Sequence, residues 1–167
     1  LNERAHFPLL GANLKSDLYS PQENLVKTFQ GVKLGIFGLS TANTPRKLLP
    51  GQTAGGEFGQ EIITAREQIK VLKDQGANCI IGLSHLGVPY QREDEFAEFV
   101  DTYEDESDFS DRVITNLELA YLVDGIDLIV SGRTNPGYHP PWEDPPTHTL
   151  IVQGYGGASN IGHMSST

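Results

Sequence analysis

The sequence predicts an α/β fold that contains parallel strands. Two short apolar runs, Cys79 to Leu83 and Asp127 to Ser131, have the composition of buried strands, and polar residues and a glycine follow each of them closely. Residues 60 to 75 carry apolar side chains at helical spacing, as expected for a helix that crosses between two such strands. Ligands of open α/β sheets bind beyond the carboxyl ends of the strands, so His85 is the first candidate site residue.

The composition limits the possible functions. At 167 residues the chain fits one domain, residues 1 to 167. Its longest apolar runs are too short to cross a bilayer, which excludes a membrane-spanning segment from these residues. The net charge of −10 argues against nucleic-acid binding, which requires a basic surface. Because Cys79 is the one cysteine, no internal disulfide can form.

The first forty residues predict strands, with one alternative. Residues 7 to 14 form an apolar run that predicts a buried strand. Residues 20 to 23 (Ser-Pro-Gln-Glu) have the form of a helix capping box. Residues 25 to 29 are instead rich in β-branched and aromatic side chains, and Gln30-Gly31 separates them from the apolar residues 32 to 39. We favour the β-hairpin over the helix.

The central region predicts a β-loop-helix-β unit. Residues 41 to 59 are rich in Thr, Pro and Gly and predict a loop. The following helix, over residues 60 to 75, is expected to end at Gly76. With the strand at residues 79 to 83, this order predicts a pair of parallel strands joined by a right-handed crossover.

An acidic segment follows, in which ten of the 22 acidic residues of the chain lie between positions 93 and 111. Apolar residues recur within it at helical spacing, namely Phe96, Phe99, Val100 and Tyr103. This pattern predicts an amphipathic helix with a solvated charged face. A calcium-binding loop is excluded because residues 101 to 111 lack the central glycine that such a loop requires.

The last third predicts a second crossover unit and a proline-rich loop. Ser110 and Asp111 are expected to cap a helix that ends at Asp124-Gly125 and whose apolar face contains Val113, Ile114, Leu117 and Tyr121. After the strand at 127 to 131, residues 136 to 146 contain too many prolines for a regular element, so they predict a loop ordered by aromatic packing or a flexible arm.

The chain end predicts two more strands, joined by a glycine-rich turn. Residues 149 to 153 form an apolar run, and a last short strand is expected near residues 161 to 164. The segment Gly154-Tyr-Gly-Gly157 between them has neither the following helix nor the lysine of a phosphate-binding loop, so it predicts a turn.

The ordered set of strand ends resembles the second half of the metallophosphatase domain of 5′-nucleotidases, which are calcineurin-like phosphoesterases. The segments that carry this resemblance are 7 to 14, 31 to 41, Ile81-Gly-Leu-Ser-His-Leu-Gly87, Gly125-Ile-Asp-Leu-Ile-Val-Ser-Gly132 and 151 to 162. The resemblance implies that the chain is part of a four-layer α/β/β/α sandwich with a dinuclear centre of divalent metal ions (Mn, Zn, Mg or Ca). It also implies hydrolysis of nucleotide phosphomonoesters or related phosphodiesters, and a periplasmic or secreted location.

Carried across residue by residue, the resemblance assigns His85 and Asn135 as metal ligands. Arg133 stands where the family has a ligand histidine, but guanidinium has no lone pair to donate to a metal. Arg133 is therefore the candidate catalytic residue, since it could supply the positive charge of a lost ion or bind a phosphate; the alternative is a salt-bridged surface arginine. Tyr138 and Trp142 could stack on a nucleobase, or could hold the proline-rich loop in place.

The family's upstream Asp-x-His and Gly-Asn-His motifs do not occur in this sequence, which begins at Leu1 without a signal-type segment. We therefore expect the chain to be a C-terminal half, to assemble neither ion alone and to be inactive alone. The competing hypothesis is a noncatalytic remnant or interaction module whose exposed sheet is covered by a partner chain or by self-association.

Overall fold

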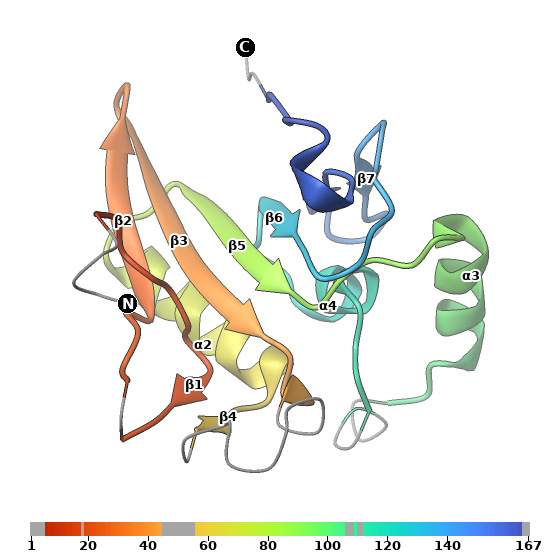
Figure 1. Ribbon diagram of the computed structural model, residues 1–167, viewed down its shortest axis with the longest axis horizontal. Helices are drawn as coiled ribbons and strands as arrows, with labels where there is room; N and C mark the ends of the chain where they lie inside the picture. Colours follow the sequence, from red (N-terminus) through yellow and green to blue (C-terminus); the bar gives the residue numbers. More distant parts are fainter. Residues whose placement is uncertain (1–5, 18, 45–55, 106–108, 110–111, 165–167) are drawn as a thin grey trace.

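A computed structural model of the chain describes residues 6–17, 19–44, 56–105, 109 and 112–164. Its main feature is a six-stranded mixed sheet in the order β2-β3-β5-β6-β8-β7 (Figure 1). The strands are β2 (Asn24–Phe29), β3 (Val32–Ser40), β5 (Cys79–His85), β6 (Leu128–Ser131), β7 (Trp142–Glu143) and β8 (Leu150–Val152). Strands β3, β5, β6 and β8 run parallel, whereas the edge strands β2 and β7 are antiparallel to their neighbours. The α/β class predicted from the sequence is confirmed.

The β-hairpin at residues 24 to 40 is also confirmed, and the alternative helix is wrong. Its two turn residues, Gln30 and Gly31, both have positive φ angles, of 49° and 85°. A two-residue turn of this kind has the twist that matches two antiparallel strands. The hairpin places β3 beside β5, so that β3 is the outer one of the four parallel strands on that side of the sheet.

Among the described residues, three α-helices accompany the sheet: α2 (Glu61–Asp74), α3 (Arg92–Thr102) and α4 (Asn116–Leu122). In Figure 1, α2 crosses behind strands β2, β3 and β5. Gly35 lets α2 approach β3, because a Cβ atom at this position would lie only 3.1 Å from the side chain of Leu72. The side chains between sheet and helices are fully buried and include Phe37, Leu72, Ile80, Leu117, Ile129 and Ile151.

The opposite face of the sheet is apolar and open in the described part of the chain. Residues on this face alternate with the core residues along each strand, and they include Ile36, Ile81, Leu83, Leu128, Val130 and Val152. Leu83 and Val130 are neighbours in register, and each is 40% exposed. The chain thus forms one helical layer and one sheet layer of the expected sandwich. No helix of the described residues is long and apolar enough to cross a membrane.

The predicted strand at residues 7 to 14 is wrong. Only Leu14–Lys15 forms a strand (β1), which pairs with β4 (Glu57–Phe58), while Leu10 makes an isolated bridge to Gln22. The segment instead contacts the sheet through single bonds, such as the Ala12 amide donating to the Gly38 carbonyl at 2.8 Å. Pro8 lacks an amide donor, so an apolar run that contains it does not pair continuously.

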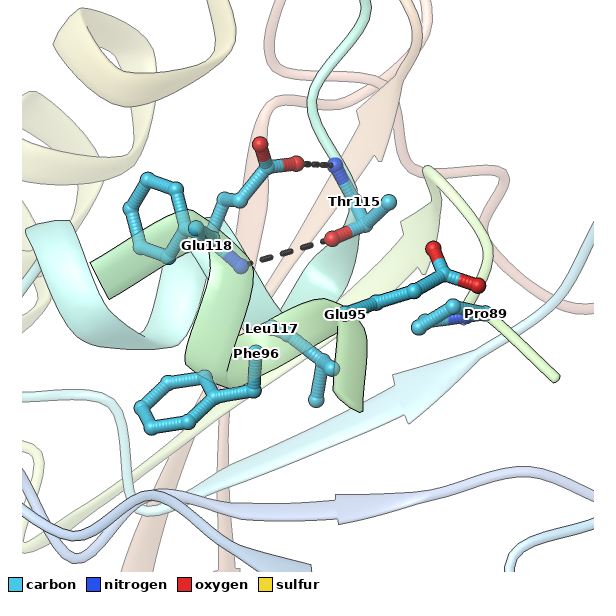
Figure 2. Close-up of a pocket in the computed structure, with 7 residues that line it drawn as sticks. Pro89, Glu95, Phe96, Thr115, Leu117 and Glu118 are labelled. Carbon is cyan, nitrogen blue, oxygen red and sulfur yellow. Dashed lines mark hydrogen bonds between the residues drawn. The ribbon is translucent and has the colours of Figure 1, made fainter. Parts of the chain in front are cut away.

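The predicted start of the helix before β6, which is α4, is wrong as well. Ser110 and Asp111 lie outside the described residues, and α4 begins at Asn116 with Thr115 as its N-cap. Figure 2 shows the reciprocal bonds: the Thr115 amide donates to Glu118 Oε2 (2.5 Å) and the Glu118 amide to Thr115 Oγ1 (3.4 Å). A capping box satisfies two helix-end donors at once, which explains why the helix starts here. Val113, predicted on its apolar face, lies before the helix and is 36% exposed.

Two predictions near the chain end also fail. The proline-rich loop contains the short edge strand β7, because Trp142 and Glu143 lie between prolines and retain their amide groups for pairing with β8. Residues 161 to 164 form no strand. Strand β8 is already paired on both sides, by β6 and β7, so it offers no free edge to this segment.

Candidate functional site

The candidate site lies where β5 and β6 end side by side. The two strands are parallel, and the Gly132 amide donates to the Ser84 carbonyl at 2.9 Å. His85, the last residue of β5, and Gly132, the first residue after β6, therefore lie side by side. A Cβ atom at Gly132 would lie 3.9 Å from Cδ2 of His85. The structure therefore brings His85 next to the segment 132–135, as the strand order predicts. His85 is exposed and Ser84 is buried, which confirms that they point to opposite faces.

Arg133 is the first side chain after this junction. Its φ angle of 92° is unusual for a residue other than glycine, and such backbone strain is often found at functional sites. The partly buried guanidinium donates from Nη1 to the Leu86 carbonyl at 3.1 Å. No described carboxylate forms an ion pair with it. It borders an open hollow lined also by Tyr90 and Glu95.

Asn135 lies on the surface two residues further on. A Cβ atom at Gly156 would lie 2.7 Å from Asn135 Oδ1, so the amide oxygen rests directly against the backbone that follows β8. Asn135 thus lies between two strand ends, those of β6 and β8. Its amide oxygen lies near the carboxyl edge of the sheet, and its role as a metal ligand stays a prediction.

Thr134 holds the loops after β5 and β6 together. Its Oγ1 donates to the Val88 carbonyl and accepts a bond from the Val88 amide, both at 2.9 Å. Gly87, with a φ of 83°, makes this contact possible, because a Cβ atom there would lie 2.8 Å from Thr134 Cγ2. We call these two bonds between Thr134 and Val88 the Thr134 clamp. The clamp fixes the backbone of the loops that follow His85 and Arg133.

A buried chain of polar side chains lies beneath the site. Ser84 Oγ donates to Asn116 Oδ1 (2.6 Å), and Asn116 Nδ2 donates to Ser131 Oγ (2.7 Å). Ser131 Oγ then donates to Gln153 Oε1 (2.5 Å), and Gln153 Nε2 donates to the carbonyls of Thr134 (2.9 Å) and Pro136 (2.7 Å). These bonds join the ends of β5, β6 and β8 to helix α4.

The sequence reasoning missed this network. Ser84, Ser131 and Gln153 each come at or just after the end of an apolar strand run, which is a signal that polar groups meet in the interior at one level of the sheet. Asn116 carries no comparable local signal, since it is fully buried only because α4 packs against that level.

Tyr138 and Trp142, the predicted substrate-binding residues, both contact Arg92 of α3. The Arg92 guanidinium carbon lies 5.2 Å from the Tyr138 ring centre and 5.9 Å from that of Trp142. Tyr138 is 7% exposed, and its hydroxyl donates to the Pro89 carbonyl at 2.9 Å. Burial raises the pKa of this phenol above its ordinary value, so the hydroxyl stays protonated as a donor. The Trp142 ring packs against Phe96, with centres 5.1 Å apart. The two aromatic residues therefore order the proline-rich loop.

The described residues do not by themselves fit a dinuclear metal centre. His85 can supply an imidazole nitrogen and Asn135 an amide oxygen, but Arg133 can supply no ligand atom. No group of three or more His, Cys, Asp or Glu side chains that could hold a metal ion occurs among the described residues. Two neutral ligands are too few to hold two divalent cations, which favour several oxygen or nitrogen donors each.

A separate small cavity of about 70 Å³ lies between α3 and the start of α4 (Figure 2). Glu118 on its wall is occupied by the capping box and by Arg112. Phe96, Phe99 and Leu117 line it as well, and the rings of Phe96 and Phe99 in α3 pack against Tyr121 of α4, with centres 6.0 and 5.3 Å apart. The cavity is therefore a packing feature of that contact.

Sequence comparisons identify relatives over most of the chain. It is 34% identical over 141 residues to the NAD 5′-nucleotidase of Haemophilus influenzae, a match that covers 81% of this chain and 19% of that protein. It is 27% identical over 155 residues to the trifunctional nucleotide phosphoesterase protein of Bacillus subtilis, which covers 80% of this chain and 9% of that protein. The chain thus spans less than a fifth of either relative. No protein-family model matches it.

A structural comparison agrees with these matches. The solved structure of the Haemophilus influenzae NAD nucleotidase matches 90% of this chain with a TM-score of 0.64 and 26% sequence identity. The match covers 29% of that structure. Most of this chain therefore has the fold of one part of that protein.

Proposed function

Because this chain is homologous to part of the 5′-nucleotidase-like metallophosphatase domain, we propose that it belongs to a metal-dependent hydrolase of nucleotide phosphomonoesters or related phosphodiesters. The phosphoesterases of this family depend on metal ions. The observation that carries the proposal is the meeting of His85 with the segment 132–135 at the carboxyl ends of β5 and β6. This is the edge at which α/β sheets bind their ligands.

In this proposal His85 and Asn135 are ligands of a metal site that residues outside this sequence complete. The metal, when bound, would polarise the phosphoryl group and activate water. The Thr134 clamp and the buried polar network keep the backbone around His85 and Asn135 fixed, so that their donor atoms meet the metal in one geometry. The chain alone would be inactive, since it supplies two ligands.

Arg133 has the catalytic role in the proposal. Its guanidinium is always protonated, makes one hydrogen bond within the described chain and is not neutralised by a described carboxylate. Its remaining donors can bind two phosphoryl oxygens at once and stabilise the charge that develops during hydrolysis. Trp142 and Tyr138 would assist indirectly, by holding the loop that follows this residue.

The first test is metal binding at His85, observed by NMR. Mn²⁺ is expected to broaden the His85 ring signals at lower concentration than those of exposed His163, and His85→Ala should abolish the selective effect. His163→Ala serves as the matched control. Equal broadening of both rings would contradict a role for His85 as a ligand.

Hydrolysis is the second test. AMP and p-nitrophenyl phosphate should be turned over slowly or not at all by the chain with Mn²⁺ or Zn²⁺. Metal-dependent turnover that His85→Ala abolishes would mean that these residues suffice for a working centre.

By the resemblance to the family, we also propose a periplasmic or secreted location, which fractionation of the native host would test.

A noncatalytic interaction module is the second candidate function. The observation that favours it is the open apolar face of the sheet, on which Leu83 and Val130 are each 40% exposed. Faces of this kind mark interaction sites. A chain that binds neither metal nor phosphate but associates through this face would support the module.

A further inference from the structure

The hollow beside Arg133 carries two opposite charges that do not pair with each other. It has a volume of about 390 Å³, and its lining includes Arg133, Glu95 and Tyr90. Among the described residues, neither Arg133 nor Glu95 forms an ion pair with the other or with a third side chain. A hollow of this size suits a small organic ligand. The two unpaired charges favour a ligand that carries both signs of charge.

The carboxylate of Glu95 is available to a positively charged group. Glu95 lies in the first turn of α3 and is exposed. In Figure 2 its carboxylate points away from Glu118, the acid that pairs with Arg112. The arginine of the same helix turn, Arg92, is bound elsewhere, since its Nε donates to Glu93 (2.6 Å) and its Nη1 to the Pro140 carbonyl (2.9 Å).

Tyr90 adds an aromatic ring to the hollow. It is 73% exposed, and it makes none of the ring or cation contacts found among the described aromatic residues. The face of such a ring attracts a cation, and quaternary ammonium groups are bound in this way. A carboxylate and an unoccupied ring in one hollow therefore favour an ammonium group.

Hydrogen bonds hold the wall of the hollow in place. The Thr134 clamp ties Val88 to the loop after β6. The Tyr138 hydroxyl donates to the Pro89 carbonyl at 2.9 Å. The chain that leads to Tyr90 is thus fixed relative to that loop, so that less conformational freedom is lost when a ligand binds.

We propose that this hollow selects phosphate esters of amino alcohols, with the phosphate bound by Arg133 and the ammonium group by Glu95 and Tyr90. The inference rests on the proposed function, in which Arg133 binds phosphoryl oxygens, and adds a substrate class and two specificity-determining residues to it. The remaining donors of Arg133 match two oxygens of the phosphate. Val113, which also lines the hollow and is 36% exposed, suits the methylene groups of the alcohol.

The test compares phosphocholine with 3,3-dimethylbutyl phosphate, a carbon analogue of the same shape in which a neutral carbon replaces the charged nitrogen. Competition between the two on the purified chain, followed by saturation-transfer NMR, should show that phosphocholine binds about three- to thirtyfold more tightly, the range that a cation–π contact provides. Glu95→Gln and Tyr90→Leu should each reduce this preference without weakening the carbon analogue. Glu98→Gln, at an exposed position of α3 outside the hollow, is the matched control.

Equal binding of the two esters by the parent chain would overturn the inference and leave the proposed function intact. A preference for phosphocholine that survives both Glu95→Gln and Tyr90→Leu would do the same. Arg133→Gln tests the phosphate site itself and should weaken both esters alike. No binding of either ester, or binding that Arg133→Gln leaves unchanged, would contradict the proposed role of Arg133 and the inference with it. A preference that Glu95→Gln and Tyr90→Leu reduce and Glu98→Gln retains supports the inference.

Discussion

At the scale of single residues, Arg133 separates this chain from a metal site built on histidines. In the assignment that we propose, it stands where the family has a ligand histidine and carries a fixed positive charge in place of a nitrogen lone pair. The loop after β6, which carries Arg133, is held by hydrogen bonds that do not involve this side chain. Thr134 Oγ1 donates to the Val88 carbonyl, and Gln153 Nε2 donates to the Thr134 carbonyl. The geometry of this loop therefore depends on these bonds and not on a metal ligand at position 133.

Arg133→His should increase the affinity of the chain for Mn²⁺. The substitution restores an imidazole beside His85 and Asn135, and histidine tolerates a positive φ better than most residues do. Calorimetry of Mn²⁺ binding by the variant and the parent measures the effect, with an expected gain on the order of tenfold. Arg133→Gln is the control that removes the charge without supplying an imidazole. An unchanged affinity in Arg133→His would mean that the other ligands are too distant.

Asn116→Ala should destabilise the chain by about 2 to 4 kcal/mol. Asn116 is 0% exposed and bonds both Ser84 and Ser131, so its removal leaves the Ser84 hydroxyl without its acceptor and the Ser131 hydroxyl without its donor, at about 1 to 3 kcal/mol each. Urea denaturation measures the loss. Asn160→Ala, at an exposed position, should change stability by less than about 0.5 kcal/mol. Equal midpoints for the two variants would show that the network contributes no stability.

Asp144 makes the stability depend on pH. The residue is 0% exposed, Oδ2 accepts bonds from Thr147, and Oδ1 has no hydrogen-bond partner in the described part of the chain. Burial raises the pKa of Asp144 above its ordinary value of 3.8, and the bonds from Thr147 oppose the rise. The native state therefore binds the proton more tightly than the unfolded state. This contribution to stability is complete below pH 3.8 and is lost as the pH rises through the native pKa.

Asp144→Asn should remove that loss, because the amide retains an oxygen for Thr147 and carries no charge. The variant is expected to gain stability relative to the parent as the pH is raised from 4 to 8, whereas the two should differ least at acidic pH. Thermal unfolding at a series of pH values measures the difference. A difference that is constant across this range would contradict a raised pKa for Asp144.

At the scale of elements, short local signals decide where each element begins and turns. The capping box of Thr115 and Glu118 sets the start of α4, and the pair Gln30-Gly31 sets the register of the hairpin. In both cases the signal lies in two residues, a capping pair in the first and a turn pair in the second. Longer apolar runs without such a signal, as in residues 7 to 14, do not form an element.

The hairpin turn can be strengthened or weakened by one residue. Gln30→Asn is expected to raise the free energy of unfolding by about 0.5 kcal/mol, because Asn tolerates the positive φ of 49° better than Gln. Gly31→Ala, at a φ of 85°, should lower it by about 1 to 2 kcal/mol. Chemical denaturation tests both. A stabilising effect of Gly31→Ala would be incompatible with this turn type.

At the scale of the whole molecule, the two faces of the sheet differ. One is covered by α2 and α4 and forms the core, while the other is apolar and carries none of the described helices. Exposed apolar surface is unfavourable by about 25 cal/mol per Å². The open face therefore favours contact with further protein, either the rest of the domain or another chain.

The purified chain should accordingly bind a hydrophobic dye and associate as its concentration rises. Replacing the neighbouring pair Leu83 and Val130 by lysine should reduce both effects, because two charges would then lie at the middle of the open face. Sedimentation velocity measures the association. Val71→Lys, at an exposed position on α2, is the matched control. A parent chain that stays monomeric without binding the dye would contradict this view of the face.

By itself, the sequence determined the α/β class, the hairpin, the helices at 61–74 and 92–102 and the placement of His85 and Arg133 at strand ends. These features depend on residue periodicity and on turn residues, which are local. Tertiary structure alone decided that Ser131 joins Asn116 to Gln153 beneath the site, that Arg92 lies over the rings of Tyr138 and Trp142, and that Tyr155 rests on Gly137. These partners lie 15 to 50 residues apart in the chain. Contacts of that range depend on how strands and helices pack, for which no local pattern in the sequence provides a signal.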